Sequence, residues 1–212
     1  MEIYPIISYG YDSNCYIIFD EKICIIDTGF TKEIREKISE ILNKIKNIKD
    51  REIFIINTHC HYDHIGNDGK ISEKFNAKIF ISEYDRDTII EKDENKVLNY
   101  LFGKKFPKID KVEFVKDNAI INLGETKLRI IHTPGHTHGS ISIYENKSKI
   151  LFTGDLIFAD SIGRNDLVDS NVELQKKSIE KILKIDFENL YSGHGRIGKF
   201  EDALKVYKMF FE

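Results

Sequence analysis

The sequence predicts a layered α/β or α+β domain in which helices lie outside a core of β-sheet. Three observations indicate this class. Short apolar segments typical of strands occur in two groups along the 212-residue chain. Segments with the three-to-four-residue apolar spacing of amphipathic helices lie between and after these groups. Hydrophobic residues make up 41% and charged residues 32% of the chain, which excludes a disordered or fibrous class. At this length we expect a single domain covering residues 1–212.

The first group of strands is expected to begin with a β-hairpin. Apolar segments at 14–19 and 22–27 flank the turn Asp20-Glu21, and the turn-forming residues Asp27-Thr28-Gly29 follow. A helix is then expected to begin after Thr31, a plausible N-cap residue. The apolar residues at helical spacing are Ile34, Ile38, Ile41, Leu42, Ile45 and Ile48. One face of this helix must therefore be buried.

Residues 53–56 are apolar without alternation and too few for a helix, which is typical of a central strand covered on both faces. Further strands are expected at 78–82, 111–115, 127–132, 140–144, 149–153 and 189–192. Further helices are expected at 68–75, 84–102, 171–184 and 199–211.

The region 84–110 has the least regular pattern. Its segment "NYLFGKKFPKID" contains Tyr100, Leu101, Phe102, Gly103, Phe106 and Pro107. Two hypotheses follow. The region is either an extra helix that caps the core, or a mobile lid whose aromatic wall faces a substrate.

Composition and charge narrow the classes of function. The net charge is −3, and 32 basic residues are scattered among 35 acidic ones, so no surface for nucleic acid is predicted. No apolar stretch has the length of a membrane span, and "MEIYPIISYG" lacks the features of a signal peptide. The chain contains three cysteines, Cys15, Cys24 and Cys60. An odd number of cysteines indicates reduced thiols rather than a set of disulfide bonds. We therefore expect a cytoplasmic protein.

The segment "NTHCHYDHIG", residues 57–66, contains three of the seven histidines and follows the buried strand directly. On an extended segment, His59 and His61 project to the same side and can bind one metal ion. Asp63 and His64 follow after a turn and point elsewhere, which provides a ligand pair for a second ion. Imidazole and carboxylate groups together suit zinc and iron.

Three later segments each contain one more candidate ligand. "IIHTPGHTHGS" contains His136, "ILFTGDLIF" contains Asp155, and "LYSGHG" contains His194. Each candidate lies at the end of a predicted strand in a glycine-rich turn, where the backbone can approach a metal closely.

In this order, "THCHYDH", "TPGHTHGS", "TGD" and "SGHG" resemble the metal-binding motifs of the metallo-β-lactamase-fold hydrolases, and the resemblance covers nearly the whole chain. "NCYII", "IIDTGF" and "GRNDL" are similar more particularly to the compact glyoxalase II-like subgroup, related to hydroxyacylglutathione hydrolases. Asn165 departs from this subgroup, which more often has Thr there. The resemblance implies a four-layer αββα sandwich with the site at one edge of the two sheets.

The resemblance also implies a binuclear metal site. It implies that the first ion is held by His59, His61 and His136, the second by Asp63, His64 and His194, and that Asp155 bridges them. Two divalent ions are expected, most often zinc, with iron or manganese as alternatives for the same ligands.

Such a site is expected to make a metal-bridging hydroxide that attacks a carbonyl, with Asp63 and Asp155 as catalytic residues. A small anionic thioester is the expected substrate, because a thiolate leaving group with a pKa of about 8.5 needs little protonation. Arg164 is expected either to hold a substrate carboxylate or to form an ion pair with Asp166. Tyr62 is expected either to line the pocket or to pack.

Three alternatives remain open at this point. Persulfide dioxygenases resemble the same subgroup and use one iron ion, here held by His59, His136 and Asp155. A lactone hydrolase would share the fold and the nucleophile. A non-catalytic binding module is the third, although all seven ligands are present. Metal content and oxygen uptake distinguish the oxidoreductase from the hydrolases.

Overall fold

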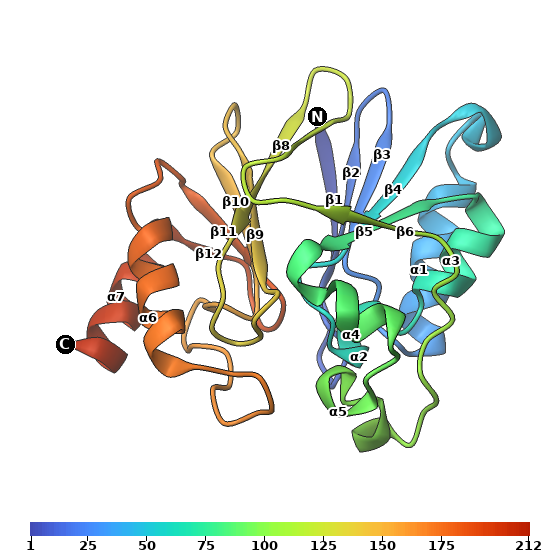
Figure 1. Ribbon diagram of the computed structural model, residues 1–212. Helices are drawn as coiled ribbons and strands as arrows, with labels where there is room; N and C mark the ends of the chain where they lie inside the picture. Colours follow the sequence, from blue (N-terminus) through green and yellow to red (C-terminus); the bar gives the residue numbers. More distant parts are fainter.

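Two six-stranded mixed β-sheets face each other in the computed structural model, which describes residues 1–212, and helices cover both outer faces (Figure 1). This is the αββα arrangement that the sequence predicts. None of the helices has the length and apolar character that would let it cross a membrane.

The first sheet has the strand order β1-β2-β3-β4-β5-β6. Its strands are β1 (Glu2–Ile6), β2 (Cys15–Phe19), β3 (Ile23–Ile26), β4 (Ile53–Ile56), β5 (Lys78–Ser82) and β6 (Val112–Val115). Strands β1 to β3 pair antiparallel, and β3 to β6 pair parallel. All residues of β3 and β4 are buried, as expected for central strands covered on both faces.

The second sheet has the order β12-β11-β10-β9-β8-β7. Its strands are β7 (Ile120–Asn122), β8 (Lys127–His132), β9 (Ile141–Glu145), β10 (Ile150–Gly154), β11 (Asn189–Ser192) and β12 (Gly198–Lys199). Only β10 and β11 pair parallel, and the chain crosses between them through a helix.

Helices cover the outer face of each sheet (Figure 1). They are α1 (Lys32–Asn43) and α3 (Asp68–Phe75) on the first sheet, and α6 (Val172–Ile182) and α7 (Phe200–Phe211) on the second. Thr31 caps α1 by accepting a hydrogen bond from the Ile34 N–H, as the sequence predicts. The remaining helical segments are α2 (Tyr62–Ile65), α4 (Arg86–Ile90), α5 (Glu94–Val97), η1 (Ile48–Asp50), η2 (Glu83–Asp85) and η3 (Asn99–Phe102).

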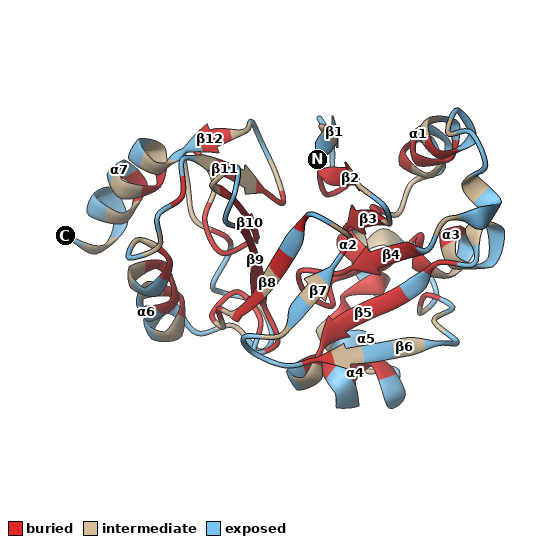
Figure 2. Cartoon of the chain, turned by 90° about the horizontal axis from the view of Figure 1, so that it is seen from above, coloured by how far each residue is buried: buried red, intermediate tan, exposed pale blue.

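The largest apolar cluster lies between the two sheets, where buried residues of both inner faces meet (Figure 2). Phe152 of β10 is at its centre, with its ring 5.4 Å from that of Tyr16 and 5.2 Å from that of Tyr191. Two further clusters fill the spaces between each sheet and its helices. The central strands of each sheet are therefore buried on both faces, which explains why β3, β4, β9 and β10 have no exposed positions.

The region 84–110 differs most from the prediction, because short segments replace the single helix expected at 84–102. Lys92 and Leu98 have left-handed backbone conformations, with φ of 54° and 61°, and a right-handed helix cannot continue through such residues. Asp93 then caps the next segment, α5. The apolar spacing indicated that one face of this region is buried. It did not indicate where the helix breaks, because the breaks depend on tertiary packing.

Other differences are smaller. Helix α1 ends at Asn43 rather than near residue 48, and Ile45 and Ile48 pack against the same apolar cluster from outside the helix. Strands β1, β7 and β12 were not predicted, and the turn expected before Asp63 and His64 forms one turn of helix, α2. These elements are short, and β1 is an edge strand that contains Pro5, so none has a strong local pattern.

Replacing Phe152 with Ala should lower the free energy of unfolding by about 3–5 kcal/mol, because the ring is fully buried between the sheets. Urea unfolding of the metal-free protein measures this. Phe210→Ala is a matched control, since Phe210 on α7 is 45% exposed, and it should cost about 1 kcal/mol or less. Equal losses in both variants would contradict this account of the core.

Candidate metal centre

Four turns meet at one edge of the sandwich, the edge where Figure 1 shows α2, α4, α5 and the loop after β10. They bring together all seven side chains that the sequence singles out. The side chains form three overlapping groups of potential ligands: His59, His61 and His136; His59, His64 and Asp155; and Asp63, His64 and His194. Ligand atoms within each group lie within 4.8 Å of one another.

The first group is built around His61. Its Nδ1 lies 3.1 Å from Nε2 of His59 and 2.9 Å from Nε2 of His136. Donor atoms around one tetrahedral zinc ion, with bonds of about 2.0–2.1 Å, lie roughly 3.3 Å apart. His59 and His61 therefore face the same side, as expected for positions two apart on an extended segment.

The second group depends on the turn α2, which starts after His61 and carries Asp63 and His64. Asp63 Oδ2 lies 3.7 Å from His64 Nε2 and 3.2 Å from His194 Nε2. The sequence predicted a turn here, and α2 forms it. His64 also belongs to the group with His59 and Asp155, so the groups overlap.

Asp155 lies between the two groups. Its Oδ1 is 3.4 Å from Nε2 of His64, and its Oδ2 is 3.5 Å from Nε2 of both His136 and His194. One carboxylate therefore reaches ligand atoms of both groups.

Several buried polar atoms of this cluster have no hydrogen-bond partner and could bind metal ions. His64 Nε2 and Asp155 Oδ1 are buried and accept or donate no hydrogen bond. Buried polar atoms without partners are costly and rare, so a ligand is expected to satisfy them. Imidazole nitrogens and carboxylate oxygens are donors that zinc, iron and manganese accept, and the residues present fit a pair of such ions.

Hydrogen bonds behind the ligands orient the imidazole rings. His64 Nδ1 lies 2.8 Å from Asp27 Oδ2, and Asp27 in turn accepts hydrogen bonds from the backbone N–H and the hydroxyl of Thr58. His136 Nδ1 lies 2.8 Å from the carbonyl oxygen of Arg164. Each bond occupies one ring nitrogen and turns the other nitrogen towards the cluster.

The turn that carries His194 is held by the other sheet. Asn14 donates hydrogen bonds from its side chain to the carbonyl oxygens of Ser192 (3.0 Å) and Gly195 (2.9 Å). The hydroxyl of Tyr16 donates to the Ser192 carbonyl at 2.6 Å. Gly193 must be glycine here, because a Cβ would overlap the Asp155 carboxylate and the His64 ring.

The two groups differ in protonation. Burial lowers the pKa of His59, His61 and His136, that of His61 to about 3, so these rings stay neutral. Burial opposes the charged forms of His64 and His194, but nearby carboxylates raise the pKa of both. Burial alone would raise the pKa of Asp63 and Asp155. The nearby imidazoles of His64 and His194 outweigh this effect and hold the pKa of both carboxyl groups below the usual range. The first group is therefore ready to bind a cation, whereas the second must first lose protons.

Comparison with known proteins identifies the family. The family model of the metallo-beta-lactamase superfamily matches residues 9–194. The chain belongs to this superfamily. It is 40% identical over 204 residues to a probable metallo-hydrolase of Methanocaldococcus jannaschii, covering 90% of this chain and 91% of that one. It is 29% identical over 204 residues to the hydroxyacylglutathione hydrolase GloC of Haemophilus influenzae, covering 92% and 90%.

Two solved structures share the metallo-beta-lactamase fold over almost their whole length. The BLEG-1 B3 metallo-beta-lactamase superposes with a TM-score of 0.84 and 25% identity, covering 100% of both chains. A second protein, crystallised in a di-iron-bound form, superposes with a TM-score of 0.78 and 21% identity, covering 96% of this chain and 98% of that one. The metallo-hydrolase relatives and the buried His/Asp clusters together point to a metal-dependent hydrolase.

A cavity of about 530 Å³ opens over the metal centre of this superfamily member. Five of the seven side chains line it: His61, Asp63, His136, Asp155 and His194. The region 84–110 supplies Leu98, Leu101 and Phe102 to the wall, while its Ile89 and Val97 pack against Cys60 in a buried cluster. This region therefore caps the core and also forms an apolar wall of the cavity.

The two residues predicted to bind substrate lie in different surroundings. Arg164 lines the cavity, and its exposed guanidinium pairs with Asp166 through contacts of 2.9 and 3.0 Å. Tyr62 is not among the lining residues. Its ring packs 5.7 Å from that of Phe30 and 5.9 Å from that of Phe102, between centroids. The structure thus places Tyr62 in the packing role rather than on the cavity surface.

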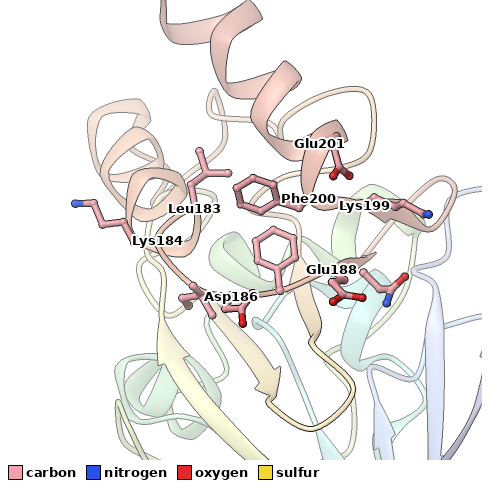
Figure 3. Close-up of a pocket in the computed structure, with 10 residues that line it drawn as sticks. Leu183, Lys184, Asp186, Glu188, Lys199, Phe200 and Glu201 are labelled. Carbon is pink, nitrogen blue, oxygen red and sulfur yellow. The ribbon is translucent and has the colours of Figure 1, made fainter.

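A second hollow, of about 630 Å³, lies between the end of α6 and the start of α7 (Figure 3). Its labelled side chains are Leu183, Lys184, Asp186, Glu188, Lys199, Phe200 and Glu201. It contains no histidine and none of the seven ligands, so we assign it no part in the metal chemistry.

The sequence did not reveal the roles of Asn14, Tyr16, Asp27 and Thr58. Asn14 and Asp27 lie in "NCYII" and "IIDTGF", which carried part of the family resemblance, so a signal was present. Their roles depend on contacts between residues that are 31 to 181 positions apart in the chain, and local sequence patterns do not show these contacts.

The second metal ion should leave before the first when the pH is lowered from about 8 to about 6, because His64 and His194 have raised pKa values and imidazole must be neutral to bind metal. The first group, with lowered pKa values, should keep its ion. Elemental analysis after dialysis at each pH measures occupancy. Simultaneous loss of both ions would contradict the difference between the groups.

Replacing Asn14 with Ala should weaken binding of one ion by about 10- to 100-fold, because the turn carrying His194 loses two hydrogen bonds. Competition with a chromophoric chelator gives the affinity for each ion. Asn95→Ala is a suitable control, since Asn95 is exposed on α5. An unchanged affinity for both ions in Asn14→Ala would show that the hydrogen bonds from the Asn14 side chain do not support this turn.

Proposed function

We propose that this protein is a binuclear metal-dependent hydrolase that cleaves thioesters, in the manner of glyoxalase II. One observation carries the proposal: two groups of neutral or ion-paired ligands meet at the single carboxylate of Asp155. A shared carboxylate between two ligand groups is what a pair of adjacent ions requires.

Each ligand has a defined task in this proposal. His59, His61 and His136 would hold the first ion. Asp63, His64 and His194 would hold the second, and Asp155 would contact both. The charges of Asp63 and Asp155 offset part of the charge of the ions, and Asp27 keeps His64 in the orientation that presents Nε2.

When bound, the two ions would lower the pKa of a water molecule towards about 7 and polarise a substrate carbonyl. The chain itself positions the substrate and limits the access of bulk water through the apolar walls of the cavity. Apart from the candidate ligands, the residues that line the cavity include no aspartate, glutamate, histidine, lysine or cysteine that could donate a proton. This favours a leaving group that departs as an anion, and a thiolate with a pKa of about 8.5 does so readily.

Arg164 supports an anionic substrate. It is the only lysine or arginine that lines the cavity. Its Nε and Nη2 contact Asp166, and the five donors of a guanidinium leave others free for a substrate carboxylate. The hydroxyacylglutathione hydrolase among the relatives supports the choice of a thioester.

The proposal is tested by purifying the protein without chelator, measuring metal content, and assaying thioester, lactone and persulfide substrates. We expect about two transition-metal ions per chain and cleavage of thioesters. Asp155→Asn should lose bound metal and about 100-fold or more of the activity. Asp110→Asn, on the exposed side chain that pairs with Lys108, should change neither.

One iron ion per chain with thiol-dependent oxygen uptake would instead indicate a persulfide dioxygenase. Cleavage of lactones alone would place the activity among the lactone hydrolases. Either result would overturn the thioesterase proposal.

A further inference from the structure

The walls of the cavity above the metal centre are mostly apolar, which bears on the substrate. One wall comes from the region 84–110 through Leu98, Leu101 and Phe102. The opposite wall comes from the loop after β10 through Phe158, Ile162 and Leu167. Five candidate ligands line the same cavity as these six apolar side chains, and Gly10, Tyr11, Ser161 and Arg164 complete the lining, so a substrate bound at the ligands would lie in a cavity with extensive apolar surface.

Both walls are anchored in the core. Phe102 packs 4.6 Å from Phe30 between ring centroids, and Leu98 is buried. On the other side, Phe158 lies 6.0 Å from His194 between centroids, and Ile162 packs against the cluster beneath α6 and α7. These side chains are therefore preformed around the space where a substrate would lie.

The polar groups of the cavity are few. Apart from the ligands, Arg164 is the only ionisable group of the lining with a fixed charge, and it already contacts Asp166. Glutathione carries two carboxylates and one ammonium group at neutral pH. The cavity offers no acidic side chain other than metal ligands for the ammonium, and one cation for the carboxylates. The lining therefore offers fewer charged partners than such an arm carries charges.

We propose that the substrate is a thioester with an extended aliphatic or aromatic arm, which lies between Leu101 and Phe102 on one side and Ile162 and Leu167 on the other. This inference rests on the proposed thioesterase function and specifies its substrate class. Leu101 is 57% exposed, so it offers apolar surface that an arm would cover.

The test uses the metal-loaded protein and the acetyl, butyryl, hexanoyl and octanoyl thioesters of N-acetylcysteamine, a small neutral thiol. The value of kcat/KM should rise along the series by up to about fourfold for each added methylene group. The glutathione thioester of the best acyl group should be cleaved no faster than its N-acetylcysteamine thioester.

Two exposed apolar residues provide a matched pair of variants. Leu101→Asn should lower the ratio of octanoyl to acetyl kcat/KM several-fold, because it replaces an apolar wall by a polar one. Met209→Asn should leave the ratio unchanged, since Met209 is 62% exposed on α7 and does not line the cavity.

The possible failures can be told apart. Cleavage of acetyl and glutathione thioesters without any gain from chain length would overturn the apolar arm and leave the thioesterase proposal standing. A ratio that is unaffected by Leu101→Asn would also overturn the placement of the arm. Absence of cleavage for every thioester would overturn both proposals.

Discussion

The metal centre depends on the direct contact between the ends of the two sheets at one edge of the sandwich. Backbone hydrogen bonds cross between the sheets there: the Asn14 N–H donates to the Gly193 carbonyl at 2.6 Å, and the Ile141 N–H donates to the Thr58 carbonyl at 2.8 Å. These bonds fix the residues next to His59 and His194. Ligands from both sheets can therefore be held within a few ångströms, which neither sheet could achieve alone.

The apolar core makes this contact stable. Side chains of both inner faces interlock around Phe152, and they fix the distance and the register between the sheets. At the edge, close packing reaches the backbone itself. Gly154 has a left-handed φ of 50°, and a Cβ at this position would overlap Thr58. Thr58 in turn donates hydrogen bonds to Asp27, so the strand end, the glycine and the carboxylate behind His64 form one packed unit.

The two groups of candidate ligands differ in the pKa values of their histidines. Burial lowers the pKa of His59, His61 and His136, whereas nearby carboxylates raise the pKa of His64 and His194. Binding of an ion to His64 and His194 would therefore compete with protons more strongly than binding to the first group. The apolar walls above this charged base add the second property of the site, because they restrict which substrates can approach the ions.

The sequence by itself determined the layered class of the fold, most of the strands, and the seven side chains that the structure brings together. It could do so because buried strands have an apolar composition, and because His59, His61, Asp63 and His64 lie in one short segment. Only the tertiary structure decided the broken helices of the region 84–110, the packing of Tyr62 and the pairing of Arg164 with Asp166. It alone assigned Asn14 and Asp27 to the support of ligands distant in the chain. These features depend on which side chains meet across the fold, and local apolar spacing contains no information about such contacts.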